Sequence, residues 1–153
     1  MPKASISKRN NLPRSDDSIR SLLTISEVIA SGDAVEDMNL VESLGRKLKR
    51  RGIQSDKAMF GLVYLMLSHR SALVRHEAAF TIGDSGRSCT FLDVAALHDP
   101  EPVVRHEACL AMGAKANRHI GKYHWVLEWI ARNDKSEMVR HSALFALSRI
   151  SEN

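Results

Sequence analysis

Apolar residues recur three and four positions apart along most of this chain, with polar residues between them. That period places the apolar side chains on one face of an α-helix and is not the alternation of a half-buried strand. The pattern predicts eight helices, at about residues 16–31, 37–51, 58–68, 72–83, 90–98, 103–114, 122–133 and 137–150. We therefore expect an all-α fold without strands.

Turn and cap residues separate these helices. Ser55 and Asp56 offer N-cap oxygens to the third helix, which is apolar nearly all round and is therefore predicted to be central. Gly52 is a C-terminal stop signal for the helix before it. Pro100 and Pro102 end one helix and begin the next, because proline lacks the backbone N–H that a helix interior needs.

A short phrase occurs three times in the second half of the chain. Residues 73–79 read LVRHEAA, residues 103–109 read VVRHEAC, and residues 138–144 read MVRHSAL. Similarity at a nearly constant period indicates a repeat array, in which each helical pair buries its apolar face against its neighbours. We therefore expect an α-solenoid of about four antiparallel helical hairpins, with residues 16–153 as a single repeat domain.

The basic charge of the chain lies mainly at its N-terminus. The formal net charge is +4, and Lys3, Lys8, Arg9 and Arg14 precede the first acidic residue. The remainder is neutral, so we interpret residues 1–15 as a loose basic leader and expect no nucleic-acid partner. Contact with an acidic partner is the alternative for the leader. The bases in residues 46–51 suit the negative end of a helix, and an anion-binding patch is the alternative there.

No apolar run reaches the roughly 18 to 20 residues that cross a bilayer, and the N-terminus lacks the apolar core of a signal peptide. The two cysteines, Cys89 and Cys109, form neither a disulfide framework nor a cysteine-rich zinc motif. We expect a cytoplasmic protein without a membrane partner, in which Cys109 is a small core residue. Trp125 and Trp129 lie four residues apart, and we expect them to pack in the core, with an aromatic binding anchor as the alternative.

The His-Glu pairs are the candidate chemistry of the chain. His76 and His106 hold equivalent positions in consecutive repeats, and Glu77 and Glu107 follow them directly. Packing of a repeat does not require histidine and glutamate at these positions. Neighbouring helices lie about 8–10 Å apart, so the two imidazoles could meet at one metal ion. A carboxylate turned about 100° around the helix suits a second ion or another subunit.

The Val-Arg-x-x-Ala-x-x-Ala-hydrophobic-Gly pattern of residues 104–113, matched by residues 74–83 except at Thr81, resembles HEAT-like repeats of the kind found in phycobilin lyases. Residues 75–83 and 102–114 are also similar to the His-Glu motifs of deoxyhypusine hydroxylase, a HEAT-like solenoid with two such pairs in each half. The resemblance implies a di-iron centre that activates dioxygen to hydroxylate a modified lysine. It implies that His76 and His106 are iron ligands, that Glu77 is a carboxylate ligand, and that Glu107 is a ligand or a substrate-side carboxylate.

The chain carries one half of that ligand set. The third phrase keeps His141 but has Ser142 in place of glutamate. A homodimer would restore four His-Glu pairs by two-fold symmetry. The alternative hypothesis is a non-catalytic scaffold, or a lyase-like or chaperone-like adaptor, that binds a protein on the concave face of the solenoid. No catalytic residue is assigned under either hypothesis.

Overall fold

The computed structural model describes residues 33–50 and 52–151, and these residues belong to one compact unit. The predicted leader at residues 1–15 and the helix predicted over residues 16–31 lie outside the described residues.

The regular structure of the described residues is entirely helical, as the apolar period predicts. In chain order it consists of α2 (Ala34–Leu48), α3 (Ile53–Ser68), α4 (Ala72–Asp84), α5 (Leu92–His98), α6 (Pro102–Met112), the short 3₁₀ helix η1 (Asn117–His119), α7 (Lys122–Asn133) and α8 (Glu137–Ser151).

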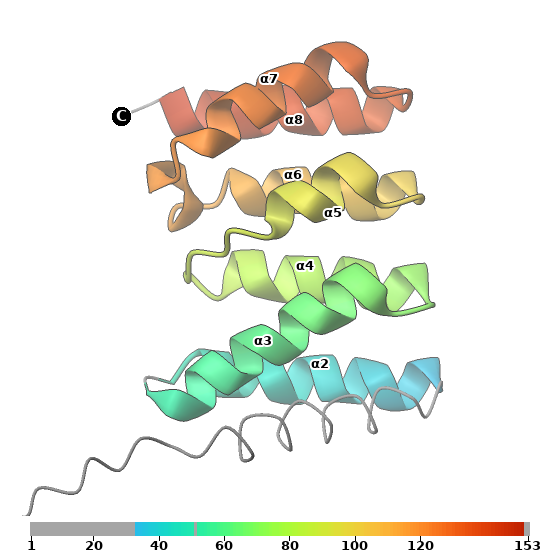
Figure 1. The fold of residues 1–153 in the computed structure, drawn as a ribbon, viewed down its shortest axis with the longest axis vertical. Helices are drawn as coiled ribbons and strands as arrows, with labels where there is room; N and C mark the ends of the chain where they lie inside the picture. Colours follow the sequence, from blue (N-terminus) through green and yellow to red (C-terminus); the bar gives the residue numbers. More distant parts are fainter. Residues whose placement is uncertain (1–32, 51, 152–153) are drawn as a thin grey trace, which may run out of the picture. The chain divides into compact units, whose positions relative to one another are not determined.

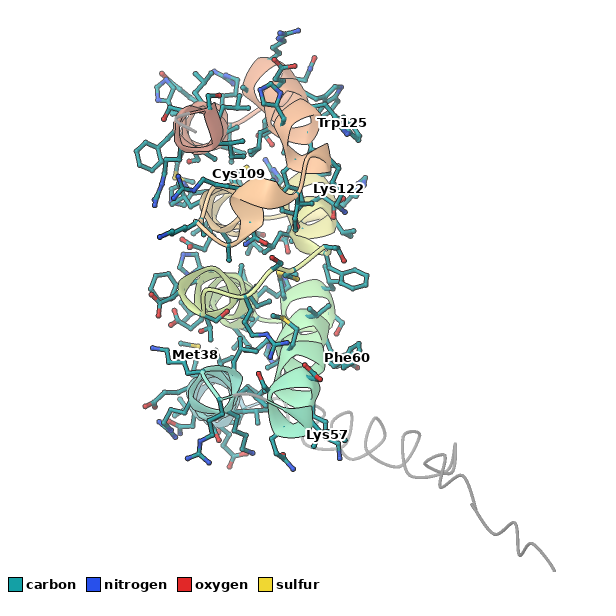
Figure 2. The ribbon with its side chains drawn as sticks, turned by 90° about the vertical axis from the view of Figure 1, so that its left-hand side faces the viewer. Met38, Lys57, Phe60, Cys109, Lys122 and Trp125 are labelled. Atoms are coloured by element: carbon teal, nitrogen blue, oxygen red, sulfur yellow. The ribbon has the colours of Figure 1, made fainter. Side chains whose placement is uncertain are left out.

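These helices form two layers (Figures 1 and 2). Helices α2, α4, α6 and α8 make the first layer, in which each helix contacts the next. Helices α3, α5 and α7 make the second layer, and each packs on the first-layer helix that follows it in sequence. The three sequence phrases lie on α4, α6 and α8, so equivalent residues recur on neighbouring helices of the first layer.

Glycines at one repeated position let the first-layer helices approach closely. A Cβ built on Gly83 would lie 2.9 Å from Ala111 Cβ, and one built on Gly113 would lie 2.8 Å from Ala146 Cα. Real Cβ atoms do not approach other atoms this closely, so no larger residue fits without a shift. Gly83 and Gly113 therefore set the spacing between α4, α6 and α8.

The arginine of the phrase joins consecutive repeats. Arg75 donates from Nε and Nη2 to the two carboxylate oxygens of Asp99, at 2.7 and 2.9 Å. Arg105 donates in the same way to Asp134, at 2.8 and 3.0 Å. In both cases Nη1 donates to the carbonyl oxygen of the loop before the same helix, that of His69 or Asp99. Bidentate pairs of arginine and carboxylate are among the strongest side-chain hydrogen bonds.

A related pair joins α2 to the loop that precedes α4. Here the acidic residue is on the helix, and its partner is in the loop. His69 Nε2 lies 2.7 Å from Asp37 Oδ2, and both side chains are almost fully buried. His69 Nδ1 accepts from the backbone N–H of Ser71 at 3.0 Å, so Nε2 carries the hydrogen and donates to Asp37. The sequence pattern gives no sign of this pair, because 32 residues separate its members.

Several helix boundaries differ from the prediction. Helix α2 begins three residues earlier than expected, because the Asp33 side chain accepts from Val35 N at 2.8 Å and caps the helix. Helix α3 begins at Ile53 rather than near Ala58, so Ser55 and Asp56 lie within the helix and the prediction that they cap it is wrong. Gly52 precedes α3 with φ of 96°, and it caps the start of that helix rather than ending the one before it.

Within residues 33–50 and 52–151, large apolar side chains of the second layer remain exposed on its outer side, which corrects two predictions. Phe60 and Tyr64 on α3 are exposed although the helix is apolar nearly all round. Trp125 and Trp129 are 61% and 52% exposed, so the prediction that they pack in the core is wrong. Figure 2 shows Phe60 and Trp125 on the outer side of this layer. Cys109 is fully buried between helices, as predicted.

None of the helices in the described part of the chain combines the length and the apolar character that crossing a bilayer requires.

Candidate metal centre

The two His-Glu phrases meet across the contact between α4 and α6. His76 on α4 places Nε2 3.5 Å from Oε2 of Glu107 on α6. Its Nδ1 lies 4.0 Å from Oε2 of Glu77, the next residue on its own helix. His76 thus lies between the two carboxylates, and the nearer one comes from the following repeat.

One nitrogen of the His76 ring is a buried polar atom without a hydrogen-bond partner. Nδ1 is buried, and no partner lies within hydrogen-bonding distance of it. Buried polar atoms almost always have a partner, so Nδ1 leaves a hydrogen bond unmade among the described residues. The orphaned nitrogen belongs to one of the four residues that the sequence selected as metal ligands.

Glu107 is the most buried carboxylate of this group, with its side chain 11% exposed. Burial raises the pKa of Glu107 above its ordinary value, because desolvation penalises the charged form. The charge of His106 acts in the opposite direction, and the negative charge of Glu77 raises the pKa further. A cation beside Glu107 would offset both the desolvation cost of the buried carboxylate and its repulsion from Glu77.

His106 occupies the position of His76 one repeat later, and it meets Ser142 instead of a carboxylate. Its Nδ1 lies 2.5 Å from Ser142 Oγ, and Ser142 Oγ donates to the carbonyl oxygen of Met138 at 2.7 Å. Ser142 stands where Glu107 stands in the preceding repeat. The histidine of each repeat therefore contacts the residue that follows the histidine of the next repeat.

His141, at the third equivalent position, lies on the exposed surface of α8. Its Nε2 is 3.9 Å from Oε1 of Glu137, one turn earlier on the same helix, and both side chains are more than half exposed. This pair differs from the one at His76 because it is formed within one helix in contact with water.

The separation of His76 Nε2 and Glu107 Oε2 suits a shared cation. Metal bonds to imidazole nitrogen or carboxylate oxygen are about 2.0–2.2 Å long, so one ion reaches two atoms up to about 4 Å apart. Among the described residues, no group of three or more His, Cys, Asp and Glu side chains is arranged to hold a metal ion. The described residues therefore bring two donors together here, and a complete shell needs further ligands. The metal-binding role of His76, Glu77, His106 and Glu107 stays a prediction.

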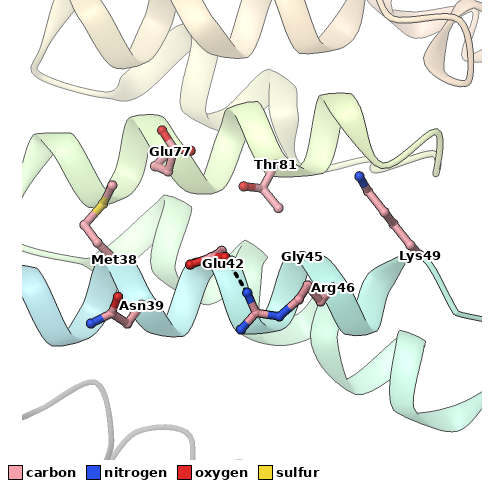
Figure 3. A pocket seen from close by; sticks show the side chains of 8 residues that line it. All are labelled: Met38, Asn39, Glu42, Gly45, Arg46, Lys49, Glu77 and Thr81. Carbon is pink, nitrogen blue, oxygen red and sulfur yellow. Dashed lines mark hydrogen bonds and ion pairs between the residues drawn. The ribbon is translucent and has the colours of Figure 1, made fainter.

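Two grooves flank the pair on the first layer. The groove between α2 and α4 has a volume of about 390 Å³ and includes Glu77 and Thr81 in its wall (Figure 3). Its other side carries Arg46, which pairs with Glu42, and Lys49. The groove between α6 and α8 has a volume of about 540 Å³, and its lining residues are His106, Leu110, Glu137, Met138, His141, Ser142 and Phe145.

The chain is 34% identical to the deoxyhypusine hydroxylase of Eremothecium gossypii over 113 residues, which cover 71% of the chain. This similarity supports a relation to deoxyhypusine hydroxylase. The match covers 33% of the fungal protein, so the chain spans about a third of the length of this curated relative. No protein-family model and no solved structure matches the chain significantly.

Ser142 contacts a candidate ligand, and the sequence pattern did not predict this contact. The third phrase has the same histidine as the others, and the substitution of serine for glutamate marked only a departure from the pattern. The position itself was the available signal, because it is the one that Glu107 fills in the preceding repeat. Only the contact between α6 and α8 shows that this hydroxyl meets His106.

Proposed function

We propose that the chain binds iron through His76 and Glu107 and acts as the metal-holding half of a hydroxylase-like protein related to deoxyhypusine hydroxylase. The observation that carries the proposal is the 3.5 Å approach of His76 Nε2 to Glu107 Oε2 between two copies of one phrase. A mixture of imidazole and carboxylate donors suits non-haem iron. When bound, iron would supply the activation of dioxygen.

The proposal includes a homodimer that shares a di-iron centre. The part of the chain that the structure describes brings together too few donors for a complete shell, and a two-fold axis would present the same donors twice. Glu77 is about a third exposed and borders the groove between α2 and α4, so its carboxylate is accessible to a partner chain. His106 would contribute the second imidazole.

We further propose that the helical hairpins are HEAT-like repeats in a cytoplasmic solenoid. The same residues make the same contacts at successive interfaces: Arg75 with Asp99, Arg105 with Asp134, Gly83 with Ala111, and Gly113 with Ala146. Recurring contacts between neighbouring units are the signature of repeat architectures.

The test is the iron content and the solution mass of the same protein. The full chain is purified without metal, loaded anaerobically with Fe(II), and examined by elemental analysis and by light scattering. We expect a dimer with at least one iron per chain, and we expect His76→Ala and Glu107→Ala to lose that iron. His141→Ala is the matched control, because that histidine is exposed and paired only along its own helix. A monomer without stoichiometric iron would refute the proposal.

A non-catalytic scaffold is the second candidate. The exposed aromatic side chains Phe60, Phe91, Trp125 and Trp129 on the second layer favour it, because aromatic residues are enriched where proteins bind one another. Substitution of Trp125 and Trp129 should leave iron binding unchanged under the first proposal. Loss of a protein partner without any effect on metal would favour the scaffold.

A further inference from the structure

Ser142 holds the His106 ring in a defined arrangement. Its Oγ lies 2.5 Å from His106 Nδ1 and 2.7 Å from the Met138 carbonyl oxygen. A serine hydroxyl has one hydrogen and two acceptor lone pairs. A carbonyl oxygen only accepts, so the hydrogen of Ser142 is directed to Met138, four residues earlier on the same helix. This bond is a common one for a helical serine.

With its hydrogen committed to Met138, Ser142 accepts from His106. The hydrogen of a neutral His106 ring is therefore on Nδ1, and Nε2 keeps its lone pair. The more common form of a free imidazole carries the hydrogen on Nε2, so the contact with Ser142 selects the other tautomer. The choice follows from the geometry of two neighbouring helices and requires no bound ion.

The ring nitrogens used at the two equivalent positions are different. His76 faces Glu107 through Nε2, whereas His106 faces Ser142 through Nδ1. The carboxylate of Glu107 attracts a cation and is itself a possible ligand. A hydroxyl that already donates to a carbonyl orients the ring without adding charge. The contact between His76 and Glu107 is thus suited to holding a metal ion. The contact between His106 and Ser142 is suited to orienting the His106 ring as a metal ligand.

We propose that Ser142 is a positioning residue that fixes His106 in the tautomer with hydrogen on Nδ1 and so makes Nε2 the nitrogen offered to metal. Histidines that ligate metals usually donate their other N–H to a nearby oxygen, which sets the tautomer and the ring direction. The metal in this inference rests on the proposed function, whereas the tautomer is a property of the metal-free chain.

The first experiment measures the tautomer in the metal-free full chain. Long-range ¹H–¹⁵N spectra of the imidazoles, recorded at about pH 8 where an ordinary histidine is neutral, distinguish a protonated nitrogen from one with a free lone pair. His106→Gln assigns the signals. We expect hydrogen on Nδ1 of His106 in the wild type. Hydrogen on Nε2 would overturn the inference, whether or not the chain binds iron.

The second experiment changes the hydroxyl. Ser142→Ala should shift His106 towards the form with hydrogen on Nε2 and should weaken anaerobic Fe(II) binding about 10- to 100-fold, the usual effect of losing an outer-shell partner. Ser142→Thr keeps a hydroxyl and should restore both properties. Ser148→Ala is the matched control, because Ser148 is on the same helix, is exposed, and donates to the Phe145 carbonyl at 2.7 Å.

Thermal unfolding of each variant shows whether it is folded at the temperature of the measurement. If Ser142→Ala is folded and keeps both the tautomer and the affinity of the wild type, Ser142 has no positioning role. If the wild type binds no Fe(II), the proposed function fails, and the tautomer spectra of the wild type and Ser142→Ala still decide the inference. The two failures are therefore distinguishable.

Discussion

His76 Nε2 and Glu107 Oε2 approach to 3.5 Å although 31 positions separate the two residues in sequence. The glutamate that follows His76 directly is farther from the ring, at 4.0 Å. The closer His-Glu pair is thus formed between repeats rather than within one. Neighbouring helices of the first layer place the histidine of one phrase against the glutamate of the next.

Glu107→Gln should stabilise the metal-free protein at neutral pH. Burial raises the pKa of Glu107, so the folded state disfavours the carboxylate, and this unfavourable contribution applies in full above the folded pKa. We expect the free energy of unfolding to rise by about 0.5–2 kcal/mol, the usual gain from one stabilising substitution.

The same reasoning gives the pH dependence. Below the unfolded pKa of glutamate, about 4.3, both states bind the proton and the advantage of Glu107→Gln disappears. Urea unfolding at about pH 7 and pH 4 measures the difference. Glu77→Gln is the matched control, because Glu77 is more exposed and should change stability less. A destabilised Glu107→Gln variant at neutral pH would contradict the prediction.

Arg105→Ala should destabilise the contact between α6 and the loop before α8. Arg105 makes two hydrogen bonds to Asp134, whose side chain is 8% exposed and would lose its partner. We expect a loss of about 2–4 kcal/mol in the free energy of unfolding, near the cost of breaking a largely buried pair. Arg140→Ala is the control, because among the described residues Arg140 donates only to the loop carbonyls of Asp134 and Lys135.

This pair should also weaken in acid. Burial raises the pKa of Asp134, but hydrogen bonds from Arg105 and from the Ser136 backbone lower it more, and the net pKa is below the ordinary value. The stabilisation is present above the unfolded pKa of aspartate, about 3.9, and is lost as pH falls through the folded pKa. Urea unfolding of the wild type and Asp134→Asn should therefore converge in that acidic range. An unchanged difference there would show that the pair is not responsible.

Gly113→Ala should destabilise the fold by about 1–3 kcal/mol, the usual cost of overpacking. Its Cβ would lie 2.8 Å from both the Cα and the Cβ of Ala146, so the backbones of α6 and α8 would have to separate. Gly121→Ala is the matched control, because nothing lies within 4 Å of a Cβ at that position. Thermal unfolding of both variants measures the effect, and equal melting temperatures would refute the close approach.

Trp125→Ala should change the free energy of unfolding by less than about 1 kcal/mol, because the indole is 61% exposed and buries little apolar area. Tyr123→Ala, two positions earlier on α7, should cost about 3–5 kcal/mol. Tyr123 is fully buried and donates from its hydroxyl to the Cys89 carbonyl oxygen. Chemical unfolding distinguishes the two variants, and a large loss at Trp125 would contradict the exposed placement.

The sequence alone predicted most of the helices. The bounds of α7 and the start of α8 agree with the apolar period, and Pro102 begins α6 as a residue of the first helical turn. These features are local, because helical spacing, caps and prolines act through neighbours within a few residues. The boundaries of α2 and α3 were harder, because Asp33 rather than a later residue supplies the cap and Gly52 belongs to the following helix.

The repeated phrase also identified the candidate residues by itself. The two His-Glu copies selected His76, Glu77, His106 and Glu107, since packing of a repeat does not demand those residue types. What the sequence could not give is their partners. Successive side chains on a helix are turned about 100° from each other, so adjacency in the sequence does not produce a contact.

Only the tertiary structure decided which side chains meet. The contact between α4 and α6 brings His76 to Glu107, and the contact between α6 and α8 brings His106 to Ser142. The same stacking leaves Trp125 exposed, because among the described helices α7 packs on α8 and α5 and the indole lies away from both. A periodic pattern specifies which residues share a helix face, whereas the spacing and register of neighbouring helices determine what that face contacts.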